Sequence, residues 1–326
     1  MRRSPPGPGG SHSAMSGQPP QTRPPFNPYL ALVIGTLAVS TGAIFARLAD
    51  APALVIAAYR VGIASLILAP IALWKARDEI AELSKRDLKL AALSGFFLAL
   101  HFATWISSLD YTSVANSVVL VNTNPLWVGL LTPLIVKEKI RRAMLVSIII
   151  SVIGGAIIGY GDFALGSQAL LGDGLALAGS FCAAIYLLLG RTLRRKLSLL
   201  PYIFICYGSA AVILWIIVLL LGLPVSGYST GTVAAFLGMA LIAQIIGHST
   251  YNWALKWFSA GLIAVSLLGE PIGATIMAYI IFNEGLTVHK IIGGIFILIA
   301  IYIAASSESR THKTQNPNIE IRNNTK

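Results

Sequence analysis

The sequence predicts an all-α integral membrane protein with ten transmembrane helices, arranged as two inverted five-helix repeats. Three observations predict this fold class. Hydrophobic residues make up 56% of the 326 residues and charged residues only 11%, which is too little charge for the surface of a soluble domain of this length. Positive charges gather in alternate loops, and a proline–glutamate motif occurs twice along the chain.

Ten apolar segments are long enough to cross a bilayer, whose hydrocarbon core takes about 20 helical residues. Some connections are very short, such as Asp110-Tyr111 and Lys256-Trp257, so neighbouring spans are expected to form antiparallel hairpins. The predicted spans are 29–46, 52–74, 88–109, 112–136, 143–160, 172–190, 200–222, 231–255, 258–282 and 287–306.

The distribution of lysine and arginine predicts the orientation of these spans. With the N-terminus in the cytoplasm, 21 of the 24 Lys and Arg residues fall in cytoplasmic loops and tails, while Arg47 and Lys290 fall outside and Arg60 lies within a span. An excess of positive charge marks cytoplasmic loops. We therefore predict a multi-pass protein of the cell inner (plasma) membrane with both termini cytoplasmic. Topology accounts for the net charge of +11, so no nucleic-acid partner is predicted.

The motif that occurs twice indicates an internal repeat. Pro125 and Glu138 lie thirteen residues apart, as do Pro271 and Glu284, and 146 residues separate the two prolines. Five spans per half is an odd number, so the second half enters the membrane from the opposite side, as in many secondary transporters. The predicted organisation is a disordered cytoplasmic tail over 1–28, repeats over 29–160 and 168–306, and a polar cytoplasmic tail over 307–326.

Two charged residues lie deep inside predicted spans. An arginine such as Arg60 costs roughly 2.5–3.5 kcal/mol near the centre of a transmembrane helix, so it needs a partner or a cavity. Glu270 is the one acidic residue placed deep in a span. Three alternatives stay open: a structural ion pair between the two halves, direct contact with substrate or a proton, or no meeting at all.

Polar faces on the third and eighth spans predict a central cavity. Residues spaced by three and four lie on one face of a helix. Equivalent polar faces in two inverted halves are expected where the halves share a binding site near mid-membrane, although interhelical hydrogen bonding is the alternative for either histidine alone. The residues are His101, Thr104, Trp105 and Ser108 in the third span, and Gln244, His248, Tyr251 and Asn252 in the eighth.

The fourth and ninth spans are predicted to be kinked. Proline frees a backbone carbonyl one turn earlier, and Pro125 and Pro271 occupy equivalent positions in the two halves. Asn124 and Glu270 directly precede them, and Asn116 lies earlier in the fourth span. Interrupted helices at equivalent positions indicate a binding site or gate.

The fifth span carries small residues at four-residue spacing. Ser151, Gly155 and Gly159 therefore predict close contact with a neighbouring helix. The chain has neither a phosphate-binding loop of the GxxxxGK[ST] type nor metal-ligand spacing of Cys and His, so no cofactor, no metal site and no ATP-driven transport are predicted.

These residues resemble the drug/metabolite transporter superfamily, in its EamA-domain family. The resemblance rests on the strings from Thr112 through Asn124-Pro125 to Glu138 and from Ser259 through Glu270-Pro271 to Glu284, and covers 29–306. It implies a basket-like bundle in which spans 1–4 and 6–9 surround a cavity. It also implies movement of small organic molecules such as amino acids, often outward. The first half departs from the pattern by carrying Asn124 where the second carries Glu270.

The predicted function is secondary transport of a small organic metabolite by alternating access, and the protein is not expected to be an enzyme. The expected substrate-binding residues are Arg60, His101, Trp105, Asn116, Gln244, His248, Tyr251, Asn252 and Glu270, with Pro125 and Pro271 as kinks. Besides the substrate and the lipid bilayer, protons and a second copy of the chain in a homodimer are candidate partners. The alternatives are a membrane-embedded enzyme such as a lipid transferase, an uptake or exchange carrier of the same fold, and a channel.

Overall fold

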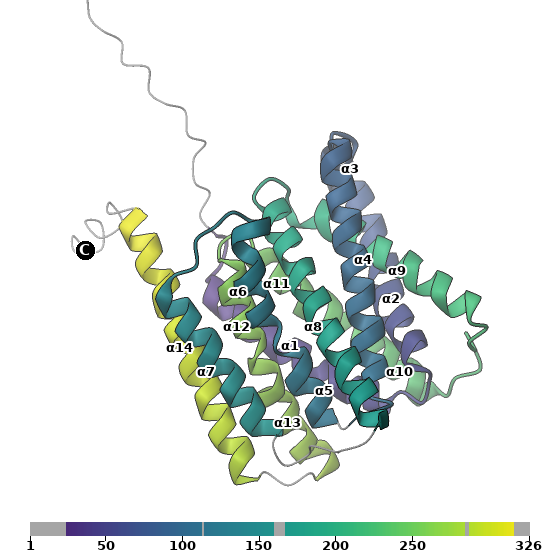
Figure 1. Ribbon diagram of the computed structural model, residues 1–326. Helices are drawn as coiled ribbons and strands as arrows, with labels where there is room; N and C mark the ends of the chain where they lie inside the picture. Colours follow the sequence, from purple (N-terminus) through teal and green to yellow (C-terminus); the bar gives the residue numbers. More distant parts are fainter. Residues whose placement is uncertain (1–23, 113, 160–166, 284–286, 316–326) are drawn as a thin grey trace, which may run out of the picture.

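The computed structural model describes residues 24–112, 114–159, 167–283 and 287–315, and folds them into a bundle of helices (Figure 1). No strand forms among these residues. The elements are α1 (Pro28–Leu48), α2 (Ala53–Lys75), α3 (Arg77–Ala81), α4 (Lys85–Ser108), α5 (Val114–Val121), α6 (Asn124–Ile135), α7 (Arg142–Gly159), α8 (Ser167–Arg194), α9 (Leu199–Leu220), α10 (Thr230–Gly238), the π-helix η2 (Met239–His248), α11 (Ser249–Ala254), α12 (Ala260–Leu267), α13 (Gly269–Phe282) and α14 (Val288–Gln315).

Seven helical stretches in the described part of the chain are long and apolar enough to cross a membrane. They fall on the predicted spans 1, 2, 3, 6, 7, 8 and 9. Three shorter apolar helices, Asn124–Ile135, Arg142–Ile157 and Ile291–Ser307, overlap the other three predicted spans. The protein is therefore an all-helical, multi-pass membrane protein.

Capping side chains explain where several spans begin. The Asn27 side chain accepts a hydrogen bond from the Tyr29 backbone at 2.9 Å in front of α1. Ser84, Ser229 and Ser259 cap α4, α10 and α12 in the same way. An N-cap oxygen satisfies one of the backbone N–H groups that a helix start leaves unpaired. Short polar residues at the ends of the apolar runs therefore fix the starts of these spans.

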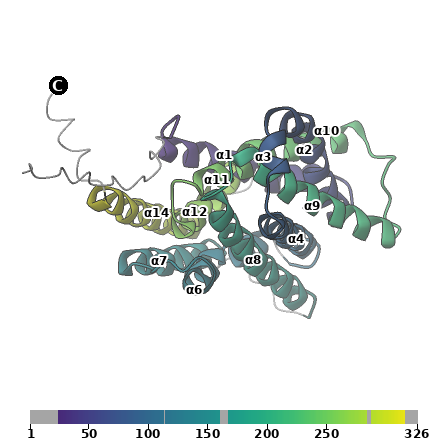
Figure 2. The same cartoon turned by 90° about the horizontal axis from the view of Figure 1, so that it is seen from above.

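Helices from the two halves of the chain pack against each other throughout the bundle. The contacts join α2 to α9, α4 to α8, α1 to η2 and α7 to α14. Seen from above in Figure 2, α7 and α14 lie side by side at one edge, and α9 lies toward the opposite edge. Helix α14 continues to Gln315, into the predicted polar tail, while residues 1–23 and 316–326 lie outside the described part.

The predicted close packing of α7 occurs one residue away from where it was expected. A Cβ added to Gly154 would lie 2.8 Å from the Gly293 carbonyl oxygen of α14 and 2.9 Å from the Phe296 Cβ, whereas a Cβ at Gly155 meets nothing within 4 Å. The prediction for Gly155 is therefore wrong. The face of α7 that contacts α14 contains Gly154, and the four-residue spacing within α7 could not indicate which face α14 would contact.

Two spans are interrupted at the equivalent positions named in the sequence. The regular α-helical hydrogen bonding is interrupted by turns at Asn122 and Thr123, between α5 and α6, and at Leu268, between α12 and α13, where the Thr123 and Leu268 N–H groups donate to carbonyl oxygens three residues earlier. Each break comes directly before the helical start that contains Pro125 or Pro271. The eighth predicted span contains the ten-residue π-helix η2, a conformation that is rare and is often found at functional sites.

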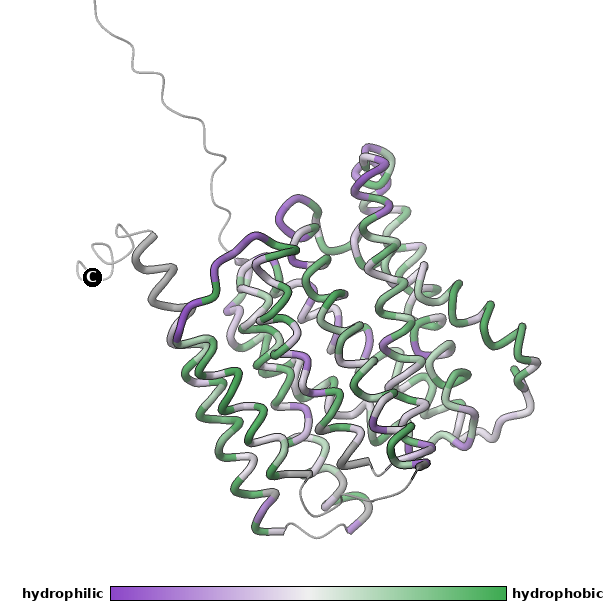
Figure 3. The backbone as a smooth tube through the Cα atoms, in the orientation of Figure 1, coloured by the Kyte–Doolittle hydropathy of each residue, from purple (hydrophilic) through white to green (hydrophobic). Residues whose placement is uncertain are grey.

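Many large apolar side chains are exposed on the outside of the bundle. The hydropathy colouring in Figure 3 is mostly apolar along the helices, with polar residues more frequent toward the ends of the bundle. Leu220, Trp74 and Tyr302 are each more than 70% exposed. A soluble monomer does not present so much contiguous apolar surface, and a bilayer accounts for it. We call the end that carries α3 and the connection from α6 to α7 the basic end, because the lysine- and arginine-rich connections lie there.

Candidate functional site

A small central cavity lies between helices of the two halves. Its volume is about 40 Å³, room for only a few water molecules. It is lined by Arg60, His101, Trp105, Val121, Asn122, Asn124, Ala183, Tyr186, Leu187, His248, Tyr251, Leu267 and Glu270. Side chains from both halves, and from both interrupted spans, therefore line the same small cavity.

Arg60 of α2 is buried, and its side chain contacts Gln244 and Phe102. Its Nε donates a hydrogen bond to Gln244 Oε1 at 2.8 Å, and its guanidinium lies 4.1 Å from the centre of the Phe102 ring. An arginine over an aromatic face gains a cation–π interaction. Gln244 comes from η2 and is itself fully buried, so the π-helix positions the residue that orients Arg60.

Glu270 lines the same cavity at the start of α13, but it forms no ion pair with Arg60 within 4.0 Å. The structure gives its carboxylate no hydrogen bond from the described residues. The structural ion pair, one of the three alternatives, therefore does not form in this conformation, and a basic and an acidic side chain line the same small cavity. Such an arrangement suits a molecule that carries both charges.

The two histidines line the cavity beside aromatic rings. His101 Nδ1 lies 3.0 Å from the Gly179 carbonyl oxygen, and its ring is parallel to Trp105 with centroids 6.0 Å apart. His248 packs edge-on against Phe102 at 5.3 Å. The contact with Gly179 fixes the His101 ring against α8.

Three buried polar atoms around the cavity lack a hydrogen-bond partner in the described residues. They are Trp105 Nε1, Asn124 Oδ1 and Gln244 Nε2. Leaving a buried polar group unsatisfied costs about 1–3 kcal/mol, so most are paired in folded proteins. Trp105 and Asn124 line the cavity itself. A ligand with its own donors and acceptors could satisfy them.

Not every predicted site residue lies at the cavity. Asn252 is fully buried in a separate network, where its Oδ1 accepts from Tyr186 at 2.8 Å and its Nδ2 donates to Tyr207 at 3.0 Å. Gln244 lies behind Arg60 and does not belong to the lining. The Asn116 side chain lies outside the described residues. Pro125 and Pro271 adjoin the helix breaks and are not part of the lining.

Tyr186 of α8 belongs to the cavity but was not predicted there. Its hydroxyl donates to Asn252, and its ring lies 6.3 Å from that of His248. The prediction considered polar faces only on the third and eighth spans. The sequence feature that could have indicated Tyr186 as a cavity residue is a tyrosine within the apolar α8, one turn from Cys182.

The EamA-like transporter family model matches residues 27–160 and again residues 170–306, which together make up most of the chain. This chain belongs to the EamA-like transporter family. An uncharacterized transporter of Clostridium kluyveri is 28% identical over 77% of this chain and 82% of its own length. An uncharacterized transporter of Archaeoglobus fulgidus is 27% identical over 78% of this chain and 88% of its own length.

One solved crystal structure shares the fold of this EamA-family protein. It aligns with a TM-score of 0.70 at 16% identity, covering 87% of this chain and 98% of the other. At that identity the likeness concerns the fold alone. The chain is thus a member of a family of transporters, and its fold matches a solved protein over 87% of its length.

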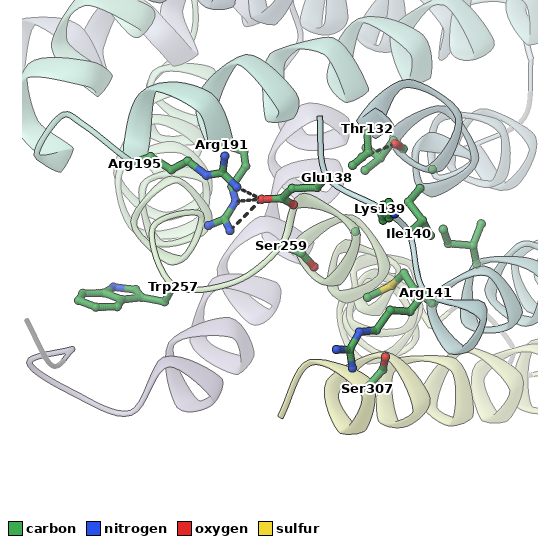
Figure 4. A pocket seen from close by; sticks show the side chains of 15 residues that line it. Thr132, Glu138, Lys139, Ile140, Arg141, Arg191, Arg195, Trp257, Ser259 and Ser307 are labelled. Atoms are coloured by element: carbon green, nitrogen blue, oxygen red, sulfur yellow. Dashed lines mark hydrogen bonds and ion pairs between the residues drawn. The ribbon is translucent and has the colours of Figure 1, made fainter. Parts of the chain in front are cut away.

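A second, larger pocket opens at the basic end of this EamA-family bundle (Figure 4). Its volume is about 460 Å³. We call it the basic pocket, because Lys139, Arg141, Arg191 and Arg195 line it against the single carboxylate of Glu138. Glu138 Oε1 accepts hydrogen bonds from Arg191 Nη2 at 3.2 Å and from Arg195. Arg191 also donates to the Leu255 carbonyl oxygen at 2.6 Å.

Proposed function

We propose that this EamA-family protein is a secondary transporter that moves a small organic metabolite, an amino acid or a related compound, outward across the inner membrane by alternating access. The observation that carries the proposal is the central cavity, which Arg60 and Glu270 both line beside buried polar atoms that have no hydrogen-bond partner among the described residues. Family membership supports transport as the activity.

The proposed architecture is ten spans in two inverted repeats. Helices of the first half have equivalents about 146 residues later: α1 and α8 end at Leu48 and Arg194, and the breaks at Asn122 and Leu268 are 146 residues apart. The packing follows the same relation, because α1 contacts η2 as α8 contacts α4. Inverted repeats give two alternative openings to one central site.

In this proposal the substrate binds between the two charges. Arg60 holds a carboxylate, which a guanidinium recognises well. Glu270 holds an amine or carries a proton, and Trp105 and Tyr251 supply apolar surface. His101, His248 and Asn124 supply hydrogen bonds. A cavity of about 40 Å³ is far smaller than ordinary ligand pockets of roughly 300–1,000 Å³, so the helices have to move to admit a substrate.

The first test is the thermal stability of the detergent-purified protein against a panel of amino acids, nucleoside derivatives and lipophilic cations. A ligand that binds only the folded protein raises its Tm by mass action. We expect amino acids to raise the Tm, and we expect Trp105→Ala to abolish the rise. Trp74→Ala is the matched control, because Trp74 is 79% exposed and away from the cavity. Hits that survive Trp105→Ala would move the site elsewhere.

Transport into proteoliposomes tests the coupling role of Glu270. If Glu270 carries a proton, Glu270→Gln should flatten the pH dependence of transport of the compound that the panel identifies. The reason is that an amide cannot exchange a proton in this pH range. Retained transport with an unchanged pH dependence would exclude this role while leaving the binding site standing.

A further inference from the structure

We propose that the basic pocket is a second, separate site that binds the phosphate group of an anionic ligand. The pocket is more than ten times larger than the central cavity, at about 460 Å³ against about 40 Å³. It involves the connection from α6 to α7, the end of α8, the turn from α11 to α12 and the end of α14. None of its lining residues also lines the central cavity.

The charge of the pocket favours an anion. Four cationic side chains line it, and Glu138 is the one carboxylate among the lining residues. Glu138 is already engaged by Arg191 and Arg195. Lys139 and Arg141 therefore add positive charge that this carboxylate does not neutralise through contacts between the described residues.

The cations stand on opposite sides of the pocket. Figure 4 shows Arg141 beside Ser307, and Arg191 and Arg195 directed at Glu138 across the pocket, with Ser259 between the two groups. Arginine side chains recognise phosphate oxygens through paired N–H donors. Arg191 already donates to Glu138 through Nε and Nη2 and to the Leu255 and Lys256 carbonyl oxygens through Nη1. Lys139 and Arg141 are therefore the cations of the pocket expected to contact a phosphate.

Apolar side chains also line the pocket. Val128 comes from α6, Ile140 from the connection between α6 and α7, and Met144 and Ile148 from α7. Cationic groups beside apolar side chains, at the end of the helices, match the chemistry of a phospholipid headgroup with the start of its acyl chains. Basic pockets between helices on the cytoplasmic side bind anionic headgroups in this way.

The simpler explanation is that these cations only orient the protein in the membrane. That explanation accounts for the number of positive charges at this end, but it requires no concave site. The two explanations differ in a measurable way. If the lysines and arginines of the basic end only orient the protein, they attract anionic lipid diffusely, and removing any two of them weakens lipid binding equally. If the basic pocket is a site, lipid binding depends mainly on the cations that line it.

The experiment measures binding of three probes to the full-length protein in nanodiscs of neutral phosphatidylcholine. The probes are phosphatidylglycerol added to the nanodisc, glycerol phosphate and inorganic phosphate. The test variant is Lys139→Gln with Arg141→Gln. The matched control is Lys85→Gln with Lys89→Gln, which removes the same charge from exposed positions on α4 that do not line the pocket. The Tm without probe verifies that each variant is folded.

We expect at least roughly tenfold weaker binding of phosphatidylglycerol to the test variant, because it loses the charge-assisted contacts that Lys139 and Arg141 would make to the phosphate. We expect less than twofold weaker binding to the control, because Lys85 and Lys89 do not line the pocket. If glycerol phosphate or inorganic phosphate alone shows the same dependence, the ligand is a soluble phosphate. Equal losses in the two variants, or no binding by any probe, would overturn the proposal. The test uses no transport substrate, so its failure leaves the proposed function untouched.

Discussion

Arg60 illustrates how a costly residue is accommodated inside this bundle. The guanidinium is buried, yet the structure pairs it with the neutral Gln244 and the Phe102 ring and not with the carboxylate of Glu270. A neutral acceptor orients the cation without cancelling its charge. Arg60 therefore stays available to an anionic group in the cavity, and the same logic leaves Glu270 available to a cationic one.

Replacing Gln244 tests how much its hydrogen bond with Arg60 stabilises the protein. Gln244→Leu removes the acceptor of the Arg60 Nε and leaves a buried charged donor unpaired, so we expect a loss of about 1.5–3 kcal/mol in the free energy of unfolding. Denaturant unfolding in mild detergent measures it. Gln168→Leu is the matched control, because Gln168 is exposed near the start of α8 and should change stability little. Equal stability of the two variants would mean that water replaces the Gln244 oxygen.

The sequence allowed part of this site to be predicted at the residue scale. Side chains expensive in a membrane, such as Arg60, Glu270 and the two histidines, lie at the cavity, because their cost requires an enclosed polar space. Asn252 has an equally polar side chain, but its amide oxygen and nitrogen form hydrogen bonds with Tyr186 and Tyr207. Helical spacing gives the face of a residue, not the partners that neighbouring helices provide, so Asn252 could not be separated from His248.

At the scale of helices, glycine placement determines the tightest contact between α7 and α14. Gly154→Ala places a methyl group 2.8 Å from the Gly293 carbonyl oxygen, and a backbone atom cannot swing aside. We expect a loss of roughly 1–3 kcal/mol, as for other overpacked contacts. The neighbouring Gly155→Ala meets nothing within 4 Å and should be neutral or stabilising by up to about 1 kcal/mol through helix propensity. Thermal unfolding of the Gly154→Ala and Gly155→Ala variants measures whether each change lowers or raises stability. Equal changes in the two variants would refute the packing described.

The interrupted fourth span leads to a kinetic prediction. Pro125 stands at the start of α6, where its missing N–H and fixed φ favour a helix start and hold the break at Thr123 in place. Pro125→Ala should let the two pieces join, which stiffens the span. We expect at least a fivefold slower transport rate with ligand affinity changed less than twofold. Pro133→Ala, on an exposed position of the same helix, is the control. A change of affinity alone would count against a role in movement.

The fold of the whole molecule was more accessible to prediction than the details of the helices. Length, composition and the 146-residue offset gave the helical class and segment positions close to those observed, because a bilayer imposes a nearly fixed span length. The π-helix in the eighth span was not predictable, since residues 239–248 have no proline to signal it. The π-helix presents Gln244 to Arg60, in the other half of the chain, and such a contact between distant segments cannot be read from the local sequence.

The orientation of the whole molecule is testable with single cysteines. Helix α2 runs between the two ends of the bundle: near its start Tyr59 donates to the Val225 carbonyl oxygen at 2.5 Å, and beyond its other end Glu79 accepts from Ser198 at the basic end. Ser226, exposed in the connection from α9 to α10, therefore lies at the end opposite to Lys85. Since positive charge marks the cytoplasmic side, we predict that Ser226 faces outward.

An impermeant maleimide applied to intact cells should label Ser226→Cys, and should label Lys85→Cys only after the cells are permeabilised. The native Cys182 and Cys206 are both buried, so background labelling is expected to be low. Labelling in the reverse order would invert the orientation, and the basic pocket would then face outward. Labelling of both sites in intact cells would mean that the ends of α2 do not lie on opposite sides of the membrane, which contradicts a spanning α2 and the ten-span arrangement built on it.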